Sequence, residues 1–355
     1  MGSAPAPVNG FPAPEAPMTG AAAAPATVLV YVGLDLVGDG LIKLPFARAL
    51  RHAFPAARIT WLAGKGKSAY AGPLAPLVRG LIDEVIEEAG VGSHWRELAT
   101  RPLGGRAFDL VIDTQRRVPT SLILRRLRHR AFVSGAAGYL LSDRRPPAGR
   151  GKPPAMIDQL LDLVAAAAGA PPVLAPPPPL DAAWTARASA LLPDGPVYVG
   201  LAPGAGGRHK CWPLDGYIGL ARAQGAAGRV PVFLLGPGET DWHDELADAV
   251  PEALFPLQDP SVSEEMLRAP VMTIALGRRL AAAVANDAGS GHILAAAETP
   301  LLSLFGPSDP AKFAPRAPRL RILRAQDFGG TADMAAIPVA AAADALDALI
   351  ATPEH

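Results

Sequence analysis

Short apolar runs recur along this chain, each followed by a turn containing Gly, Pro or Asp and then by a helix-like pattern. Such runs are typical of strands buried on both faces of a parallel sheet. They are VLVYV (28–32), RITWL (58–62), LVI (110–112), VYVGL (197–201), VFLL (232–235) and LLSLF (301–305). In 40–54 an apolar residue recurs every fourth position, which predicts a helix that Pro45 kinks or begins. The alternation predicts an α/β fold with helices on both faces of open parallel sheets.

The segment PPVLAPPPP (171–179) interrupts this alternation, and a second series of strands and helices follows it. Consecutive prolines form neither helix nor inner strand, so we interpret the segment as a linker between two doubly wound, Rossmann-like domains. The predicted parts are a disordered Ala/Pro-rich tail (1–26), an N-terminal domain (27–170), the linker (171–180), a C-terminal domain (181–332) and a final helical segment (333–355) that packs back toward the N-terminal domain. Ligands of such domains sit at the carboxyl ends of the strands, here facing a cleft.

The composition excludes several classes of protein. Half of the 355 residues are apolar and the net charge is +0, which excludes a charge-driven disordered chain and gives no overall basic field for nucleic acid. The single cysteine, Cys211, excludes an intrachain disulfide and fits a reducing compartment. No apolar run approaches the ~20 residues that span a bilayer. GxGxxG, P-loop, Asp-x-Asp and Gly-x-Ser-x-Gly motifs are also missing. We therefore expect a soluble, cytoplasmic protein without these common nucleotide-binding or hydrolase motifs.

Asp39 is the main candidate for acid–base chemistry. It follows the first predicted strand, within the sequence VGDG (37–40), at the start of a predicted helix. Two interpretations stay open: its carboxylate caps the helix by accepting backbone N–H groups, or it is a general base at the floor of the cleft. Asp35, four residues earlier, is a weaker candidate.

Three junctions in the second half suit a ligand with phosphates and sugar hydroxyls. In PGAGGRHKCWP (203–213), Gly204 and Gly206 allow close backbone approach and Lys210 supplies positive charge, although a solvated turn is the alternative. In NDAGSGH (286–292), small residues let a helix N-terminus meet an anion, and His292 is a ligand contact or a core residue. GPGE (236–239) ends in Glu239, whose carboxylate can accept hydroxyls from ribose or sugar.

Taken in order, these junctions resemble glycosyltransferase family 9, the bacterial heptosyltransferases of lipopolysaccharide core assembly. The resemblance covers most of the chain after residue 27. The matching segments are VGDGLIKLPFARALRHAFP (37–55), FDLVIDTQ (108–115), LAPGAGGRHKCWPLDGY (201–217), FLLGPGETD (233–241), NDAGSGHILAAAETPLLSLFGPSDP (286–310) and DMAAIPVAAAADAL (333–346).

The resemblance implies a GT-B fold, with the acceptor site in the first domain and a nucleotide-sugar donor, ADP-heptose by family default, in the second. It implies an inverting transfer without metal or other cofactor. Asp39 then looks like the base that deprotonates the acceptor hydroxyl, and Lys210 like the cation on the donor pyrophosphate. The donor-binding residues implied are Gly204, Gly206, Lys210, Glu239, Asp287, Ala288, Gly289 and His292, and weaker acceptor candidates are Asp35, Arg116 and Arg117.

Several positions depart from the family pattern and keep alternatives open. Gly33, Leu34 and Asp35 replace the usual Arg or Ser before Gly-Asp, and Ala288 replaces a Thr or Ser in the donor loop. A non-catalytic relative that binds a nucleotide-sugar is therefore the second hypothesis, and a UDP-sugar epimerase of similar build is the third.

A basic cluster follows the FDLVIDTQ segment and has two interpretations. Its members are Arg116, Arg117, Arg125, Arg126, Arg128 and Arg130. The cluster either meets an acidic glycolipid acceptor and the inner membrane surface, or forms an ordinary solvated helix face. Together with the resemblance, the cluster leads us to expect two partners, a nucleotide-sugar and a glycolipid or polysaccharide acceptor, at the cytoplasmic face of the membrane.

Overall fold

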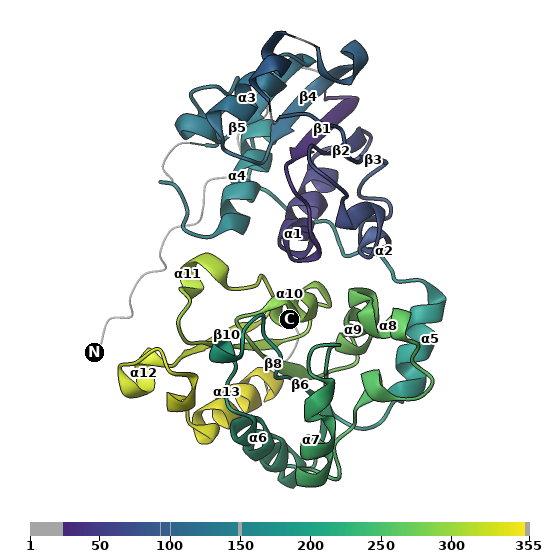
Figure 1. Ribbon diagram of the computed structural model, residues 1–355, viewed down its shortest axis with the longest axis vertical. Coiled ribbons are helices and arrows are strands. Elements are labelled where there is room, and N and C mark those ends of the chain that lie inside the picture. Colours follow the sequence, from purple (N-terminus) through teal and green to yellow (C-terminus); the bar gives the residue numbers. More distant parts are fainter. Residues whose placement is uncertain (1–23, 93, 100, 148–150, 352–355) are drawn as a thin grey trace, which may run out of the picture.

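The computed structural model describes residues 24–351 except 93, 100 and 148–150, and it contains two parallel five-stranded sheets (Figure 1). The first sheet has the order β3-β2-β1-β4-β5 and the second β10-β9-β8-β6-β7. The strands of the first sheet are β1 (Thr27–Val32), β2 (Arg58–Ala63), β3 (Glu84–Ile86), β4 (Ala107–Asp113) and β5 (Arg128–Ser134). Those of the second are β6 (Tyr198–Ala202), β7 (Val230–Phe233), β8 (Ala282–Asn286), β9 (Leu301–Phe305) and β10 (Leu320–Arg324). The predicted α/β class with two doubly wound sheets is confirmed.

Helices cover both sheets, and α1 (Val37–Ala53) is the helix of the first half that carries a predicted site residue. The α-helices of the first half are α1 (Val37–Ala53), α2 (Ala75–Val78), α3 (Val118–Leu124) and α4 (Met156–Ala168). The predicted helix at 40–54 is α1, which begins three residues earlier and contains Pro45 in its interior. It buries Leu44, Phe46 and Leu50 against the sheet and packs along α4. Its opposite end carries Asp39 in the first turn.

The inner strands of the second sheet are enclosed. Strands β6, β8 and β9 are buried along their whole length, as expected for inner strands of a parallel sheet. The α-helices of this half are α5 (Ala182–Leu191), α6 (Leu214–Ala226), α7 (His243–Ala249), α8 (Glu264–Arg268), α9 (Pro270–Gly277), α10 (Gly289–Ala296), α11 (Pro310–Phe313), α12 (Gln326–Gly329) and α13 (Val339–Ala351). Residues 171–180, the predicted linker, contain no helix or strand and run between α4 and α5.

Two edge strands were not predicted, because charged residues make up much of each strand and shorten or interrupt its apolar run. β5 begins with RHR and β10 reads LRILR, with several exposed side chains in each. An edge strand has a neighbour on one side alone, and charged side chains there oppose pairing with other chains. Residues 1–23 of the predicted tail lie outside the described part, while the amide N–H of Ala26 already bonds to Asp109 at 2.9 Å.

The prediction for the C-terminal helix is wrong. We expected residues 333–355 to pack toward the N-terminal domain, but α13 lies on the second sheet and along α6 (Figure 1). Leu346 and Leu349 are buried there in the same core as Trp212 and Tyr217. The apolar stripe of α13 is therefore used within its own domain.

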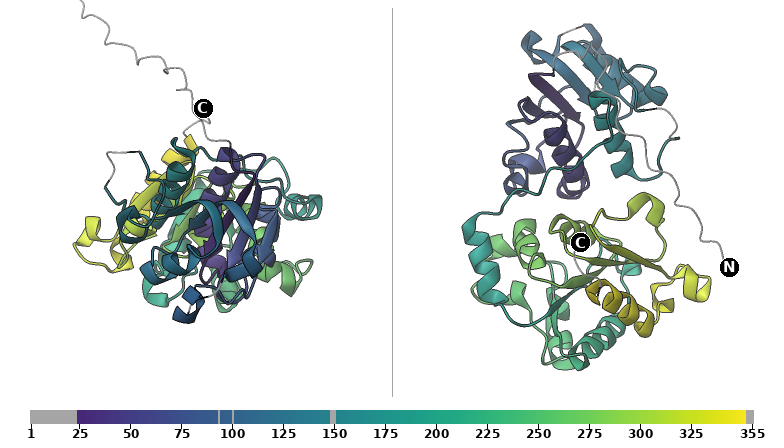
Figure 2. Two further views of the ribbon diagram at one scale, coloured as in Figure 1. Left: turned by 90° about the horizontal axis from the view of Figure 1, so that it is seen from above. Right: turned by 180° about the vertical axis from the view of Figure 1, so that it is seen from behind.

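The two domains meet through α1 and α10, which lie side by side (Figures 1 and 2). The apolar core under α1 extends to Ile274 and Ala297 of the second domain. Arg48 of α1 donates to Glu298 at 2.9 Å and to the Ala175 carbonyl of the linker at 2.6 Å, and Arg316 donates to Asp158 at 2.7 Å. Among the described residues, no helix has both the length and the apolar composition to cross a membrane.

Candidate functional site

A cavity opens at the carboxyl ends of β6 and β8 in the second domain. Its volume is about 340 Å³. Five predicted donor residues line it: Gly204, Gly206, Glu239, Ala288 and Gly289. Segments that are far apart in the sequence thus meet at one place, because the carboxyl ends of parallel strands share one edge of a sheet.

Glu239 is held between two glycines of different loops. A Cβ on Gly204 would lie 2.5 Å from its carboxyl carbon, and a Cβ on Gly236 would lie 2.8 Å from one carboxylate oxygen. Burial raises the pKa of the Glu239 carboxyl above its ordinary value. Glycine fits these two positions because it leaves room for a half-buried carboxylate that faces the cavity.

We expect Gly204→Ala to displace the Glu239 carboxylate, so that it no longer accepts a hydrogen bond from the nucleotide. A hydrogen bond to a charged group is worth ~1.5–3 kcal/mol, and we therefore expect the affinity for nucleotide to fall about tenfold. Calorimetric titration with ADP measures the affinity, and the free energy of unfolding is measured beside it. Gly238→Ala is the matched control, because a Cβ at that exposed position has no atom within 4 Å and the residue does not line the cavity. Equal affinities in the two variants would contradict the packing role of Gly204.

Asn286 organises the loop that carries Lys210, and sequence reasoning did not select it. The side chain is fully buried at the end of β8. Its Oδ1 accepts from the Trp212 amide at 3.0 Å, and its Nδ2 donates to the Pro203 carbonyl at 2.7 Å. One amide side chain therefore clamps both ends of the 203–212 loop. The signal that could have pointed to Asn286 is its side-chain amide, directly before the predicted residue Asp287.

Lys210 is the cation of this loop that faces the end of β8. Its Nζ lies 3.5 Å from a carboxylate oxygen of Asp287, so the structure brings these two predicted residues together. Arg208 instead turns toward the helix after Glu239, where it bonds to Asp241 at 2.8 Å and covers the ring of Trp242. Burial raises the pKa of the Cys211 thiol, which agrees with a packing role for that residue.

The start of α10 forms the wall next to Lys210. Ala288 occupies the N-cap position and supplies no side-chain cap, so the first N–H groups of the helix lack that partner. Ser290 follows in the first turn, lines the cavity, and has a buried hydroxyl without a hydrogen-bond partner in the described structure. Ser290 is a second residue that sequence reasoning missed, since a lone serine in a small-residue stretch carries no distinct signal.

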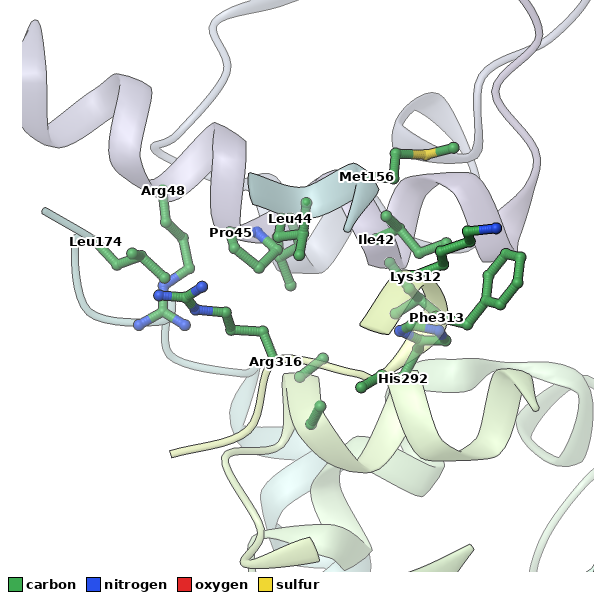
Figure 3. Close-up of a pocket in the computed structure, with 15 residues that line it drawn as sticks. Ile42, Leu44, Pro45, Arg48, Met156, Leu174, His292, Lys312, Phe313 and Arg316 are labelled. Atoms are coloured by element: carbon green, nitrogen blue, oxygen red, sulfur yellow. The ribbon is translucent and has the colours of Figure 1, made fainter. Parts of the chain in front are cut away.

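His292 lies apart from the other predicted donor residues, on the face of α10 that is turned toward α1. It lines a smaller interdomain cavity of about 100 Å³, opposite Ile42 and Pro45 (Figure 3). Burial lowers the pKa of its imidazole, against the opposing effect of Asp287. The helical turn after Asp39 thus lies across from the helical turn after Asp287.

Asp39 does not cap α1. The N-cap is Leu36, and Asp39 lies three residues later, in the first turn, with a half-buried side chain. The capping interpretation is therefore wrong as stated. An acidic group in the first turn still interacts favourably with the helix dipole.

Asp35 is not available to an acceptor, which corrects the sequence prediction. It is 1% exposed and accepts hydrogen bonds from Lys43 Nζ at 3.0 Å, Trp61 Nε1 at 2.9 Å and Ser68 Oγ at 2.6 Å. Lys43, one turn after Asp39, is also buried. The pair forms a polar node that ties the β1–α1 loop, α1 and the loop after β2 together.

The basic cluster is not a helix face. Arg125 is the C-cap of α3 and Arg126 follows it, whereas Arg128 and Arg130 lie on the edge strand β5. Arg116 is committed to Gln159 of α4, while Arg117 is exposed at the N-cap of α3. The prediction omitted two cations, Lys65 and Lys67. They are exposed after the carboxyl end of β2, at the edge of the first sheet where Arg117 follows β4.

The described residues bring no three His, Cys, Asp or Glu side chains together as a metal site. Two parallel sheets with a Gly-lined cavity at the strand ends and a cationic loop define the GT-B class of glycosyltransferase folds. The sequence profile of glycosyltransferase family 9 (heptosyltransferase) matches residues 95–336, and the chain belongs to this family.

The similar proteins include two that are named heptosyltransferases. Lipooligosaccharide heptosyltransferase 2 of Haemophilus influenzae is 28% identical in an alignment of 319 positions, which covers 83% of this chain and 88% of that protein. A glycosyl transferase family 9 structure from Veillonella parvula has a TM-score of 0.66 at 18% identity, with 92% of this chain and 97% of that chain covered. E. coli heptosyltransferase WaaC, solved with ADP, has a TM-score of 0.63 at 19% identity, covering 91% and 99%. This chain is a heptosyltransferase-like glycosyltransferase, and these structural likenesses establish its fold.

Proposed function

We propose that this protein transfers a heptose from ADP-heptose to a lipopolysaccharide-core or related glycan acceptor, with inversion and without a metal. The observation that carries the proposal is the single cavity at the ends of β6 and β8, where five of the predicted donor residues meet beside the Lys210–Asp287 pair. The relatives support the choice of donor, because WaaC was also solved with ADP-2-deoxy-2-fluoro heptose.

In this mechanism the Asp39 carboxylate takes the proton of the acceptor hydroxyl as its oxygen attacks the anomeric carbon. The bond from that carbon to the diphosphate breaks on the opposite side, and the diphosphate leaves with the electron pair. Negative charge develops on the diphosphate, and Lys210 and the N–H groups at the start of α10 stabilise it. A positioned cation and a helix N-terminus thereby take the role that a metal ion has in other transferases.

The linings of the two cavities support the remaining donor contacts of this proposal. Glu239 accepts hydroxyl groups of the nucleoside, and Ser290 contributes the hydroxyl that Ala288 lacks. His292, on the side of α10 that faces α1, contacts the sugar between the two domains. On the acceptor side, Lys65, Lys67 and Arg117 give the rim of the first sheet a positive charge that suits an anionic glycolipid.

Calorimetric titration of wild type and Lys210→Ala with ADP, UDP, GDP and ADP-heptose tests the donor site. We expect wild type to prefer the adenine nucleotides and the variant to bind them about 10–100-fold more weakly, since a charge-assisted contact to the diphosphate is lost. Lys152→Ala is the control, because Lys152 is exposed and lines neither this cavity nor the cavity of His292. Absence of all binding by folded wild type would overturn the proposal, and binding of ADP-heptose without turnover would favour the non-catalytic relative.

A further inference from the structure

Helix α3 exposes apolar side chains on the face that a soluble protein usually covers with polar ones. Val118 is 41% and Leu122 40% exposed, one helical turn apart, while Ile123 and Leu124 fill the core beneath. The helix lies on the first domain, on the side away from α6 and α7 of the second domain (Figure 1). No described part of the chain covers this face.

The 3-10 helix η2 (Trp95–Ala99) packs alongside α3 and extends the apolar surface. Trp95 is 78% and Leu98 43% exposed. We call Trp95, Leu98, Val118 and Leu122 the α3–η2 patch. Removing two leucines and a tryptophan from water is favourable. Their joint exposure therefore indicates a surface that a binding partner covers.

The charges around the patch are strongly positive, although the chain as a whole is neutral. Residues 95–130 contain nine arginines and three acidic residues. Arg96, Arg117 and Arg126 are exposed, whereas Arg125 is paired with Asp143. Glu97 is the acidic residue within η2, and its carboxylate accepts from the backbone amides of Gly92 and His94. Exposed guanidinium groups therefore border an apolar surface that contains a tryptophan.

We propose that the α3–η2 patch docks on the surface of a lipid bilayer with anionic headgroups. Tryptophan and leucine side chains enter the interface between headgroups and acyl chains, and the arginines pair with phosphates. Because α3 begins just after the carboxyl end of β4, the bound membrane lies on the edge of the sheet that also carries Asp39. The inference rests on the proposed function in one respect: a lipid-linked acceptor then reaches Asp39 without leaving the membrane.

The tryptophan content gives a direct probe. The five tryptophans all belong to the described part; Trp61, Trp212 and Trp242 are buried, Trp184 is half-buried, and Trp95 is largely exposed. We expect the fluorescence emission of the full-length protein to shift to shorter wavelength with phosphatidylcholine vesicles that contain phosphatidylglycerol. Pure phosphatidylcholine vesicles are expected to give a much smaller shift, and added salt to reduce the shift with mixed vesicles.

Two substitutions separate the apolar from the electrostatic part. We expect Leu122→Asp to lower vesicle binding about tenfold or more, since an apolar side chain is replaced by a charge at the interface, and Arg126→Glu to lower it about fivefold to tenfold, in proportion to ~1 kcal/mol per basic residue near an anionic surface. Val197→Asp is the matched control, because Val197 is also exposed, at 44%, but lies in the second domain. Flotation with the mixed vesicles measures all three variants.

Three results would overturn the inference: no spectral shift with mixed vesicles, equal flotation of Leu122→Asp and Val197→Asp, or a dimer in solution that Leu122→Asp converts to a monomer without any vesicle binding. The last outcome would assign the patch to a second copy of the chain. Nucleotide titration of Leu122→Asp keeps this test separate from the donor site, because that residue does not line the donor cavity. Wild type that binds vesicles but no nucleotide would refute the proposed function and leave the membrane surface standing.

Discussion

Replacing Asp39 by Asn is expected to lower kcat for sugar transfer by about 10²–10⁴-fold, the usual contribution of a general base. The amide has nearly the shape of the carboxylate but does not accept the acceptor proton. ADP affinity is expected to stay within about twofold of wild type, because the donor residues lie in the other domain and do not depend on this group. ADP release in the presence of acceptor measures turnover, and calorimetry measures donor binding.

The matched control for this substitution is Asp215→Asn, which changes an acid in the first turn of α6, within the second domain. Both variants lose a similar interaction with a helix dipole, about 0.3–1 kcal/mol of stability. A large loss of turnover is expected for Asp39→Asn alone. Retained turnover in Asp39→Asn would remove Asp39 from the mechanism, and equal losses in both variants would point to a general effect on folding.

Lys43→Met is expected to lower the free energy of unfolding by about 3–5 kcal/mol, the cost of leaving a buried charge without its partner. The Asp35 carboxylate would keep its bonds from Trp61 and Ser68 but lose the neighbouring positive charge. Denaturant unfolding at neutral pH measures the effect. Destabilisation of this size would also loosen the first turns of α1, so turnover is expected to fall at elevated temperature before donor binding in the other domain is affected.

The double variant Asp35→Asn/Lys43→Met shows whether charge or packing is responsible. We expect it to recover about half of the stability lost in Lys43→Met, since neither buried group then carries a charge. Arg130→Met provides a control for removing an exposed cation, whose contribution to stability is about 0–1 kcal/mol. A double variant that is less stable than Lys43→Met would mean that the hydrogen bonds of Asp35 matter more than its charge.

The inner strands, and the loops that line the cavity at their carboxyl ends, could be predicted from the sequence because their signals are local. A strand buried on both faces needs a continuous apolar run, and β1 and β6 carry one. A loop that approaches a ligand closely needs residues without a Cβ, and Gly204 meets that need beside Glu239. The order of these signals along the chain then led to the family, which the profile match confirms.

The errors concern side chains whose partners are distant in the sequence. Nothing near Asp35 indicates that Trp61 and Ser68 enclose it, so an acid close to Asp39 was interpreted as a binding residue. The first three residues of β5 are RHR, and this charged start was interpreted as part of a basic cluster, so the edge strand was missed. An Ala-rich stripe can pack on either domain, and α13 lies on its own sheet because the core around Trp212 accepts it.

The clamp that Asn286 places on both ends of the Lys210 loop has a thermodynamic consequence for donor binding. A loop that is already fixed at Pro203 and Trp212 loses little conformational entropy when a nucleotide arrives, since that cost was met when the chain folded. The loop acts as a preformed template, and its affinity depends on an amide that does not line the cavity. If Asn286 were substituted, part of the conformational entropy of the loop would be lost when the nucleotide binds and not when the chain folds.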